Sequence, residues 1–489
     1  MTEKRKILRQ VGSFASASLL TQGITVIASI LTRRFLGPLQ MGVWSFIQVI
    51  LIYAEYSTLG INNAVSREIP FHLGAKNHER AEEIKNLVFN FSVSTSLVIA
   101  AGMTLFACLY RKHLRPELLY GLFFAAALII FQRVNNLLIE LLRSYKKFAL
   151  LSRQMIFSAI VNAGLIALLA YRFKIYGFIT AMCLSLAFNI GYFLHHEKFH
   201  FRWRLDIGQV GQLIGYGFPL MMIAFLNSAL QSFDRLMITR FLGFEALGWY
   251  SIAIMSSTYI YSIPNSIGIV MLPNVQERYG EAQNIQGLKS YLLKWTFAYR
   301  DMMPILIGLA WVWVPGLVAW VLPQYQNGLD AMKLLVLSSF FFAMHNPYEH
   351  FLIAIKKHWR IFPVIFSAFA AAVLLIGLAV KNRLGIAGIA AAMTGTAFIQ
   401  FSGIYFTAGC LVYSKHELWR NYLSVLINFV LMLLALYGLQ NCVFSSNKIF
   451  QMAAQSAVLF VLWIPLLLRL NKNYGLWAAL VKKKTVPES

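Results

Sequence analysis

Apolar stretches long enough to cross a membrane alternate with short polar connectors along the whole chain. A helix needs about 20 apolar residues to span roughly 30 Å of hydrocarbon. The ten-residue stretches of alternating polarity that are typical of a membrane barrel do not occur. The pattern therefore predicts an all-α polytopic membrane protein with about 14 transmembrane helices. The expected spans are 11–31, 43–61, 86–110, 118–141, 150–171, 177–194, 214–241, 247–272, 291–313, 329–355, 360–380, 385–411, 420–440 and 449–469.

One motif occurs twice, each time between two apolar stretches. Residues 34–45 (RFLGPLQMGVWS) and 240–251 (RFLGFEALGWYS) share RFLG, a second glycine five residues on, an aromatic residue and a serine. The two copies predict the same helix-ending turn in two places. Further matches at offsets of 206 to 211 residues extend the repeat over six spans; they are Gly74 with Gly280, Asn136 with Asn346, Lys146-Lys147 with Lys356-Lys357, and 175–177 with 386–388.

Six is an even number, so both copies of the repeat enter the membrane in the same direction and form a parallel repeat. The repeat predicts an N-terminal six-helix bundle (1–205), a C-terminal six-helix bundle (206–412), and two additional helices with a basic cytoplasmic tail (413–489). The first apolar stretch follows a basic start, as in a signal peptide. Its length and its place in the repeat nevertheless predict a retained span.

Composition and charge fit a membrane protein. Charged residues make up 13% of the chain, against about 25% in soluble domains, and the net charge is +24. A basic face on a soluble domain would indicate a nucleic-acid partner, but these basic residues lie in short connectors, which argues against nucleic acid. Alternate connectors and the two termini hold 28 Lys and Arg, against 11 in the other connectors. By the positive-inside rule, we expect a multi-pass protein of the inner or plasma membrane with both termini in the cytoplasm.

Motifs of enzyme active sites and of nucleotide sites are missing from the sequence. There is no P-loop, HExxH or GxSxG, and no expected outer loop carries an acidic pair. The four cysteines lie in or beside apolar stretches, without the paired spacing of a zinc site or a disulfide framework. We therefore predict a protein that is not an enzyme, uses no cofactor or metal, and takes energy from a gradient or from its substrate.

Three arginines, Arg133, Arg235 and Arg300, lie deep inside predicted spans. Insertion scales assign about 2.5–3.5 kcal/mol to a charged residue at the centre of a membrane helix, so these side chains are expected to face protein or a watery cavity. Asp234 and Asp301 adjoin two of them. Neighbouring residues on a helix point about 100° apart. Two interpretations therefore stay open: structural pairs between helices, for example Asp234 with Arg300, or arginines that face a substrate.

The fourth and tenth spans, which are counterparts in the repeat, each carry a polar stripe. The stripe of the fourth span is Arg133, Asn136 and Glu140, and that of the tenth is His345 and Glu349. Equivalent stripes in two bundles are expected where the helices line a common central cavity. The candidate substrate-binding residues are Arg133, Arg235, Arg300, Asn136 and His345. The candidate charge partners or coupling groups are Asp234, Asp301, Glu55, Glu140 and Glu349, of which Glu55 is the weakest.

The two motif copies and the stretch 57–69 (STLGINNAVSREI) resemble the polysaccharide transporter family, over essentially the whole chain. These are the Wzx-type O-antigen flippases of the multidrug/oligosaccharidyl-lipid/polysaccharide exporter superfamily. The resemblance implies a V-shaped, MATE-like pair of six-helix bundles and transport of a polyprenyl-diphosphate-linked oligosaccharide to the outer leaflet by alternating access. It implies that cationic cavity residues, here the three deep arginines, receive the diphosphate. The implied partners are this lipid-linked oligosaccharide, membrane lipids, a polysaccharide polymerase and a chain-length regulator.

Other functions stay open. A cation-coupled drug or small-molecule exporter of the same superfamily would be expected to carry an acid in the first span, but the polar residues of 11–31 are Gln22 and small hydroxylic residues. A membrane glycosyltransferase or polysaccharide polymerase would need a large acidic outer loop, and the longest one expected here, 314–328, has no acid. A major-facilitator carrier also has two six-span halves, but its Gly- and Arg-rich loop with an aspartate after the second span is missing.

Overall fold

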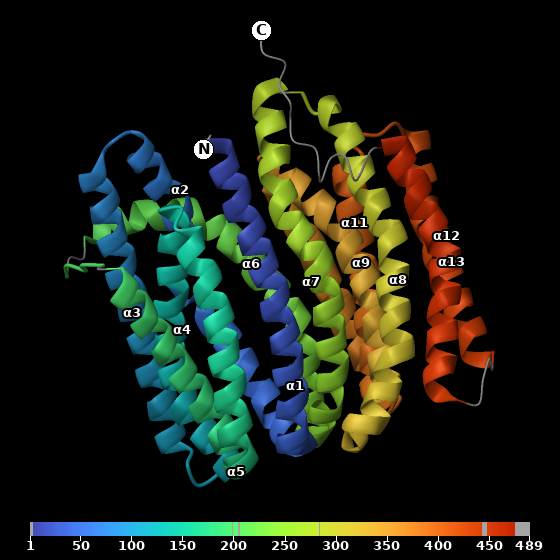
Figure 1. The fold of residues 1–489 in the computed structure, drawn as a ribbon, viewed down its shortest axis with the longest axis horizontal. Coiled ribbons are helices and arrows are strands. Elements are labelled where there is room, and N and C mark those ends of the chain that lie inside the picture. Colours follow the sequence, from blue (N-terminus) through green and yellow to red (C-terminus); the bar gives the residue numbers. More distant parts are fainter. Residues whose placement is uncertain (1–2, 198, 204–205, 283, 443–446, 475–489) are drawn as a thin grey trace. The chain divides into compact units, whose positions relative to one another are not determined.

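The computed structural model describes residues 3–474 except 198, 204–205, 283 and 443–446, and the regular structure in this range is helical (Figure 1). The α-helices are α1 (Glu3–Glu55), α2 (Asn62–Gly74), α3 (His78–Leu109), α4 (Pro116–Ser144), α5 (Phe148–His196), α6 (Ile207–Phe241), α7 (Gly243–Ala282), α8 (Lys289–Val321), α9 (Leu329–Ala354), α10 (Ile361–Lys381), α11 (Gly385–Gly409), α12 (Lys415–Asn441) and α13 (Lys448–Tyr474). Short 3-10 turns are η1 (Tyr56–Thr58), η2 (Gln286–Leu288), η3 (Pro323–Gly328) and η4 (His358–Arg360). The predicted all-helical fold class is confirmed.

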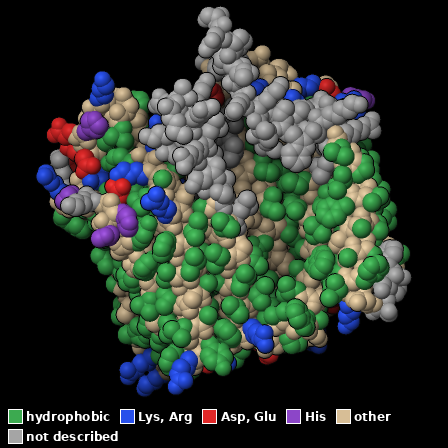
Figure 2. Space-filling model, viewed as in Figure 1, with side chains coloured by type: hydrophobic (Ala, Val, Ile, Leu, Met, Phe, Trp, Pro, Cys, Tyr) green, Lys and Arg blue, Asp and Glu red, His purple; other side chains and the backbone are tan. Residues whose placement is uncertain are grey.

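Ten helices in the described part of the chain are long and apolar enough to cross a membrane, or eleven if the bent helix α6 counts as one span. The surface in Figure 2 is the one expected of a membrane protein. Hydrophobic side chains cover the middle of the helices, and charged and His side chains gather at their ends. The prediction of a multi-pass membrane protein is confirmed. The count of fourteen spans stays a prediction, because α7, which holds the expected span 247–272, is not among these helices.

Two helices are too long to be single spans. α5 has 49 residues, which would extend about 74 Å if straight, more than twice the thickness of the hydrocarbon core. α1 and α5 each contain a residue with a non-helical backbone, Gly37 (φ 73°, ψ 173°) and Lys174 (φ 54°, ψ −132°). The ribbons of α1 and α5 each turn back on themselves (Figure 1). Each of the two helices therefore holds two of the predicted spans.

The RFLG glycines make the turns that the repeated motif predicts. Gly37 (φ 73°) and Gly243 (φ 87°) both have a positive φ, which a residue with a Cβ adopts only with strain. Gly37 separates the two arms of α1, and Gly243 begins α7 directly after α6. The helix-ending turn is thus present in both copies.

The two copies of the motif contact each other through residues that all lie within the compact unit Met1–Gly248. A Cβ added at Gly42 would lie 1.7 Å from the carbonyl oxygen of Phe244, and one added at Gly248 would lie 1.8 Å from the carbonyl oxygen of Pro38. Gly42 and Gly248 are equivalent positions of the repeat, and so are Pro38 and Phe244. The contact is therefore reciprocal, as a local two-fold axis between the copies requires.

Contacts divide the chain into two compact units, Met1–Gly248 and Trp249–Ser489. In the first unit, α5 packs against α1 and α4, α3 packs against α2 and α4, and α6 packs against α1 and α2. The short helix α2 buries Val65 and Ile69 in an apolar cluster with Leu87 and Leu141. This burial fixes α2 across the ends of α3 and α4, where it forms one wall of the cavity described below.

In the second unit, α9 is largely buried between α8 and α11, and α10 packs on α11. The last two helices, α12 and α13, both pack on α8. Small residues allow this approach, because Gly308 lies against Leu459 and Gly316 against Met452. The predicted division into 1–205, 206–412 and 413–489 stays a prediction.

Candidate functional site

Arg133 is buried in the middle of α4 and is only 1% exposed. Its Nη2 donates to the carbonyl oxygens of Ala54 (3.0 Å) and Glu55 (3.0 Å) and to Ser57 Oγ (3.3 Å). Its Nη1 donates to Glu55 Oε1 (3.3 Å) and its Nε to Ser96 Oγ (3.2 Å). Ala54 and Glu55 end α1, where carbonyl groups have no intrahelical partner and the helix dipole favours a cation. Arg133 therefore caps α1 and holds the Glu55 carboxylate in place.

A polar cavity of about 480 Å³ opens beside this arginine, between the end of α1, the start of α2 and α4. Three predicted residues line it: Glu55, Asn136 and Glu140. Asn136 Nδ2 donates to Glu55 Oε1 (3.2 Å), and the Glu55 side chain is 39% exposed. The remaining lining residues are Asn62, Asn63, Ser66, Ile139 and Arg143. The structure thus brings the polar stripe of the fourth span, on α4, together with Glu55, the candidate with the weakest support from the sequence.

The sequence analysis missed three polar residues of the cavity that α2 contributes: Asn62, Asn63 and Ser66. They lie in what the sequence suggests is an inner connector, where polar residues are expected and carry little signal. The cavity also contains a second ion pair, in which Arg143 Nη1 donates to Glu140 Oε1 (2.7 Å). Amide, carboxylate, hydroxyl and guanidinium groups together offer both donors and acceptors, which is the inventory that a sugar with many hydroxyls requires.

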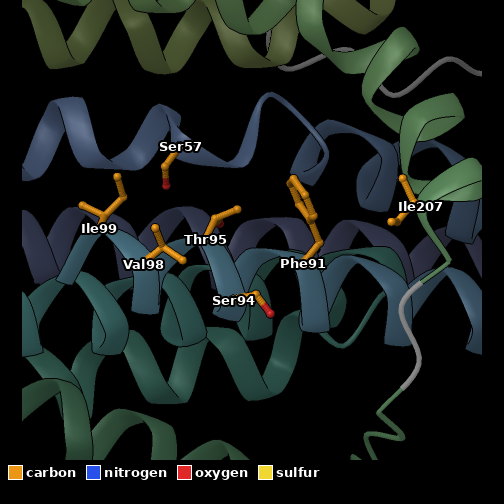
Figure 3. Close-up of a pocket in the computed structure, with 7 residues that line it drawn as sticks. All are labelled: Ser57, Phe91, Ser94, Thr95, Val98, Ile99 and Ile207. Carbon is orange, nitrogen blue, oxygen red and sulfur yellow. The ribbon is translucent and has the colours of Figure 1, made fainter. Parts of the chain in front are cut away.

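An apolar groove, also of about 480 Å³, lies between η1, α3 and the start of α6. Figure 3 shows a row of α3 side chains facing Ser57, with Ile207 from the start of α6 at one end. The α3 residues are Phe91, Ser94, Thr95, Val98 and Ile99. Ser57, which lines the groove, accepts a hydrogen bond from the same arginine that binds Glu55 of the polar cavity. The polar cavity and the apolar groove therefore adjoin one short segment, Glu55–Ser57, that Arg133 fixes.

Arg235 and Asp234 lie in α6 of the same unit, and neither lines the polar cavity. Asp234 is 3% exposed, and its Oδ1 accepts a hydrogen bond from the backbone nitrogen of Arg235 (2.7 Å). The Nε atom of Arg235 is buried without a hydrogen-bond partner among the described residues. A buried guanidinium nitrogen without a hydrogen-bond partner is unusual in a native protein, so Arg235 stays a candidate for ligand binding.

In the second unit, Arg300 pairs with its neighbour Asp301. Nε and Nη2 of Arg300 donate to Oδ1 (2.7 Å) and Oδ2 (2.9 Å) of Asp301, which is fully buried. The long arginine side chain folds back along α8, so adjacent positions do pair here in spite of their 100° separation. Two groups on α12 complete the cluster: Ser424 Oγ accepts from Arg300 Nη1 (2.6 Å), and Asn428 Nδ2 donates to Asp301 Oδ1 (3.2 Å). This geometry favours the structural interpretation for Arg300, since the cluster ties α8 to α12.

His345 and Glu349, the stripe of the tenth span, also come together in the second unit. His345 Nδ1 lies 3.4 Å from Glu349 Oε2 on α9. His345 is almost fully buried, so it does not line an open cavity of its unit. No group of three or more His, Cys, Asp and Glu side chains in the described part of the chain has a geometry that could hold a metal ion.

Comparison with known proteins gives the relatives of this chain. Residues 7–277 match the family model described as "Polysaccharide biosynthesis protein". A Shigella flexneri protein named "Putative O-antigen transporter" is 24% identical over 332 residues, which cover 64% of this chain and 76% of that protein. An inward-facing multidrug resistance MATE family transporter of the MOP superfamily superimposes with a TM-score of 0.65 at 14% identity, over 82% of this chain and 96% of its own. The lipid II flippase MurJ, in its inward closed conformation, has a TM-score of 0.65 at 14% identity, over 96% and 99% of the two chains. At these identities the solved structures establish the fold, which is MATE-like as predicted.

Proposed function

We propose, from the premise that this chain belongs to the polysaccharide biosynthesis protein family, that it is a flippase for a lipid-linked oligosaccharide. The chain is a multi-pass membrane transporter and not an enzyme. The proposed substrate is a polyprenyl-diphosphate-linked oligosaccharide, which moves from the cytoplasmic to the outer leaflet of the inner membrane for assembly of an O-antigen-like polysaccharide. The observation that carries the proposal is the polar cavity of the first unit, whose volume of about 480 Å³ suits a few sugar units.

The glycan is proposed to bind in the polar cavity through hydroxyl groups. Sugar hydroxyls donate to the carboxylates of Glu55 and Glu140 and accept from Asn136, Asn62 and Arg143. Hydrogen bonds to charged groups contribute about 1.5–3 kcal/mol each, and several of these partners already bind one another. Because the sugar replaces hydrogen bonds that these residues already make with one another, the net gain on binding is small. The affinity therefore stays low enough for the transporter to release its substrate on the far side of the membrane.

The lipid chain is proposed to begin in the apolar groove. Val98, Ile99 and Ile207 present aliphatic surface there, and all three are partly or largely exposed. An amphipathic substrate has a polar head and an apolar chain, and the two spaces adjoin the same segment, Glu55–Ser57. This arrangement supports a lipid-linked substrate over a small soluble one.

We assign the substrate diphosphate to Arg235, which lies on α6 three residues beyond Ser232, where a hydrogen bond between Ser232 Oγ and Tyr53 Oη (2.8 Å) holds α6 against the end of α1 that adjoins both spaces. The guanidinium groups of Arg133 and Arg300 are engaged by protein groups, whereas Nε of Arg235 lacks a partner among the described residues. A guanidinium donates paired hydrogen bonds to phosphate oxygens that a lysine ammonium cannot reproduce. Arg133 then acts by positioning Glu55, and Arg300 by holding α8 and α12 together.

The test is to delete the gene and measure the leaflet in which lipid-linked oligosaccharide accumulates. We expect accumulation on the cytoplasmic leaflet, with rescue by the wild-type chain but not by Arg235→Lys at equal expression. Arg240→Lys, at an exposed arginine near the end of the same helix, is the matched control and should rescue fully.

Two outcomes would contradict the flippase proposal. Unpolymerised units already on the outer face would indicate a polymerase, and an undisturbed oligosaccharide with loss of drug resistance would indicate a drug exporter. Rescue by Arg235→Lys would refute only the assignment of the diphosphate to Arg235.

A further inference from the structure

The two members of the first ion pair at the polar cavity differ in how far a ligand can reach them. The Glu55 side chain is 39% exposed, whereas that of its partner Arg133 is 1% exposed. Nη2 of Arg133 donates to the carbonyl oxygens of Ala54 and Glu55, so the guanidinium serves the end of α1, and Arg133 is not among the residues that line the cavity. This pair therefore presents a carboxylate to the cavity and keeps its cation behind the wall.

The second ion pair, between Glu140 and Arg143, presents both of its charges. Both residues line the cavity, and their side chains are 31% and 49% exposed. Arg143 lies three residues after Glu140 on α4, and its Nη1 donates to Glu140 Oε1 (2.7 Å). An anion that approaches Arg143 must therefore approach the Glu140 carboxylate as well. The lining side chains hold two carboxylates and one guanidinium, and that guanidinium is already paired.

The carboxylates also retain unused hydrogen-bond acceptors. Oε1 of Glu55 accepts from Arg133 and Asn136, and Oε1 of Glu140 accepts from Arg143. The Oε2 atom of each carboxylate has no hydrogen-bond partner among the described residues. An ionised carboxylate accepts hydrogen bonds and donates none, so both atoms require hydrogen atoms from a ligand or from water.

Two asparagines of the cavity add further acceptors. Asn63 Nδ2 donates to the carbonyl oxygen of Gly217 (3.3 Å), and Asn136 Nδ2 donates to the first of the two carboxylates (3.2 Å). Within the described part of the chain, the side-chain oxygens of both asparagines make no hydrogen bond. Asn62 is the reverse case, because its Oδ1 accepts from Ser92 Oγ (3.0 Å) and its amide hydrogens stay available. The cavity thus offers a ligand several acceptor oxygens, and two of them are charged.

We propose that the polar cavity selects a glycan that carries no carboxylate, which excludes uronic acids and other acidic sugars. The inference rests on the proposed flippase function and names the class of its substrate. Sugar hydroxyls donate to the acceptor oxygens of the cavity, whereas a sugar carboxylate has no hydrogen to donate. It would also place a third negative charge beside Glu55 and Glu140, and like charges placed together in a binding site weaken binding strongly.

The diphosphate of the substrate does not conflict with this selection. It is assigned to Arg235 on α6, which does not line the polar cavity. The anionic part of the substrate and its glycan therefore bind to different residues. Selection against negative charge applies to the glycan alone.

The first test uses the deletion strain of the flippase experiment. The lipid-linked oligosaccharide that accumulates there is extracted, its glycan is released with mild acid, and mass spectrometry identifies the sugars. We expect no uronic acid or other sugar with a carboxylate. A glycan that contains such a sugar would overturn this inference and leave the flippase proposal intact. Absence of any accumulation would contradict the flippase proposal, and the inference with it.

The second test measures binding to the full chain in lipid nanodiscs by native mass spectrometry. The probes are two polyprenyl-diphosphate disaccharides that differ only in their terminal sugar, glucose in one and glucuronic acid in the other. The wild type should bind the glucose probe at least about tenfold more tightly, and Glu55→Gln/Glu140→Gln should reduce this preference to within about twofold, because glutamine keeps the size and removes the charge. Glu117→Gln, in the first turn of α4 and so at the opposite end of that helix from Glu140, is the matched control and should keep the preference.

Two results would overturn the charge preference: equal binding of both probes by the wild type, or an unchanged preference in the double variant. Should the double variant fail to fold, Glu140→Gln alone decides the question, because its partner Arg143 is half-exposed. Its preference should fall at least about threefold. An unchanged preference in that variant would overturn the inference.

Binding of neither probe would instead contradict the flippase proposal, on which the inference rests.

Discussion

Replacing Gly42 by alanine should force apart the two copies of the repeated motif. The added Cβ would lie 1.7 Å from the Phe244 carbonyl oxygen and 2.6 Å from its carbon, whereas even close C···O contacts in proteins are about 3.3 Å. The backbone must therefore move by more than about 1 Å on at least one side. Overpacking costs about 1–3 kcal/mol, and we expect the upper end because a backbone carbonyl cannot change rotamer to escape.

The assay is thermal unfolding of the purified full chain in detergent. Gly248→Ala should lower the unfolding midpoint as much as Gly42→Ala, because its Cβ meets the Pro38 carbonyl oxygen at 1.8 Å. Gly102→Ala is the matched control, since this helical glycine has nothing within 4 Å of an added Cβ. There alanine should stabilise the helix by up to about 1 kcal/mol through its better helix propensity.

Three results would refute this reasoning. Equal midpoints for Gly42→Ala and Gly102→Ala would show that the close approach does not exist. A large effect at Gly42 with none at Gly248 would show that the contact is not reciprocal. The double variant should cost less than the sum of the two single variants, because the first already separates the copies; full additivity would mean that the glycines belong to separate contacts.

The remaining predictions concern the buried charges and the topology. Arg133→Lys should lower the free energy of unfolding by about 2–4 kcal/mol, because an ammonium group cannot donate to all five acceptors. Arg143→Lys, at a half-exposed position, is the control and should change the free energy of unfolding by no more than about 0.5 kcal/mol in the same assay. Arg300→Gln should cost about 3–5 kcal/mol by leaving the buried Asp301 carboxylate without its cation, and adding Asp301→Asn should recover most of it; no recovery would mean that the pair is not the source of the loss. In a background without native cysteines, single cysteines at Glu245 and Lys448 should react with an impermeant thiol reagent from outside. A cysteine at Lys483, which lies outside the described residues, should not react, and its labelling would overturn the orientation.

The helices and the turns of this fold could be predicted because each depends on a short stretch of chain. The thickness of the hydrocarbon core sets the length of the apolar stretches. Each predicted span overlaps a described helix, although the second one, 43–61, runs past the end of α1 at Glu55. The turns at Gly37 and Gly243 were predictable because both copies place a glycine where the backbone needs a positive φ. The stripe of Asn136 and Glu140 on α4 likewise follows from helical spacing alone.

The partners of the buried charges could not be predicted, because they depend on how helices rotate against one another. The acceptors of Arg133 come from η1, α3 and the end of α1, and two of them are hydroxyls, Ser57 and Ser96, that resemble many others in apolar spans. The pairing of Arg300 with Asp301 depends on a side chain that folds back along its own helix. Spacing predicts where a Cβ points, whereas a long flexible arginine side chain can pair with any acceptor within its reach.

The reciprocal contact at the repeated motif has a consequence for how the two copies of the motif can change their sequences. Each glycine meets a backbone carbonyl, which every residue type possesses, so the contact restricts positions 42 and 248 but not the residues that supply the carbonyls. The carbonyl groups come from Pro38 in one copy and from Phe244 in the other. The aromatic residue two positions after the contacting glycine also differs, as it is Trp44 in one copy and Tyr250 in the other. A contact made by main-chain atoms thus lets the two copies of the motif diverge in their side chains while the contact itself is kept.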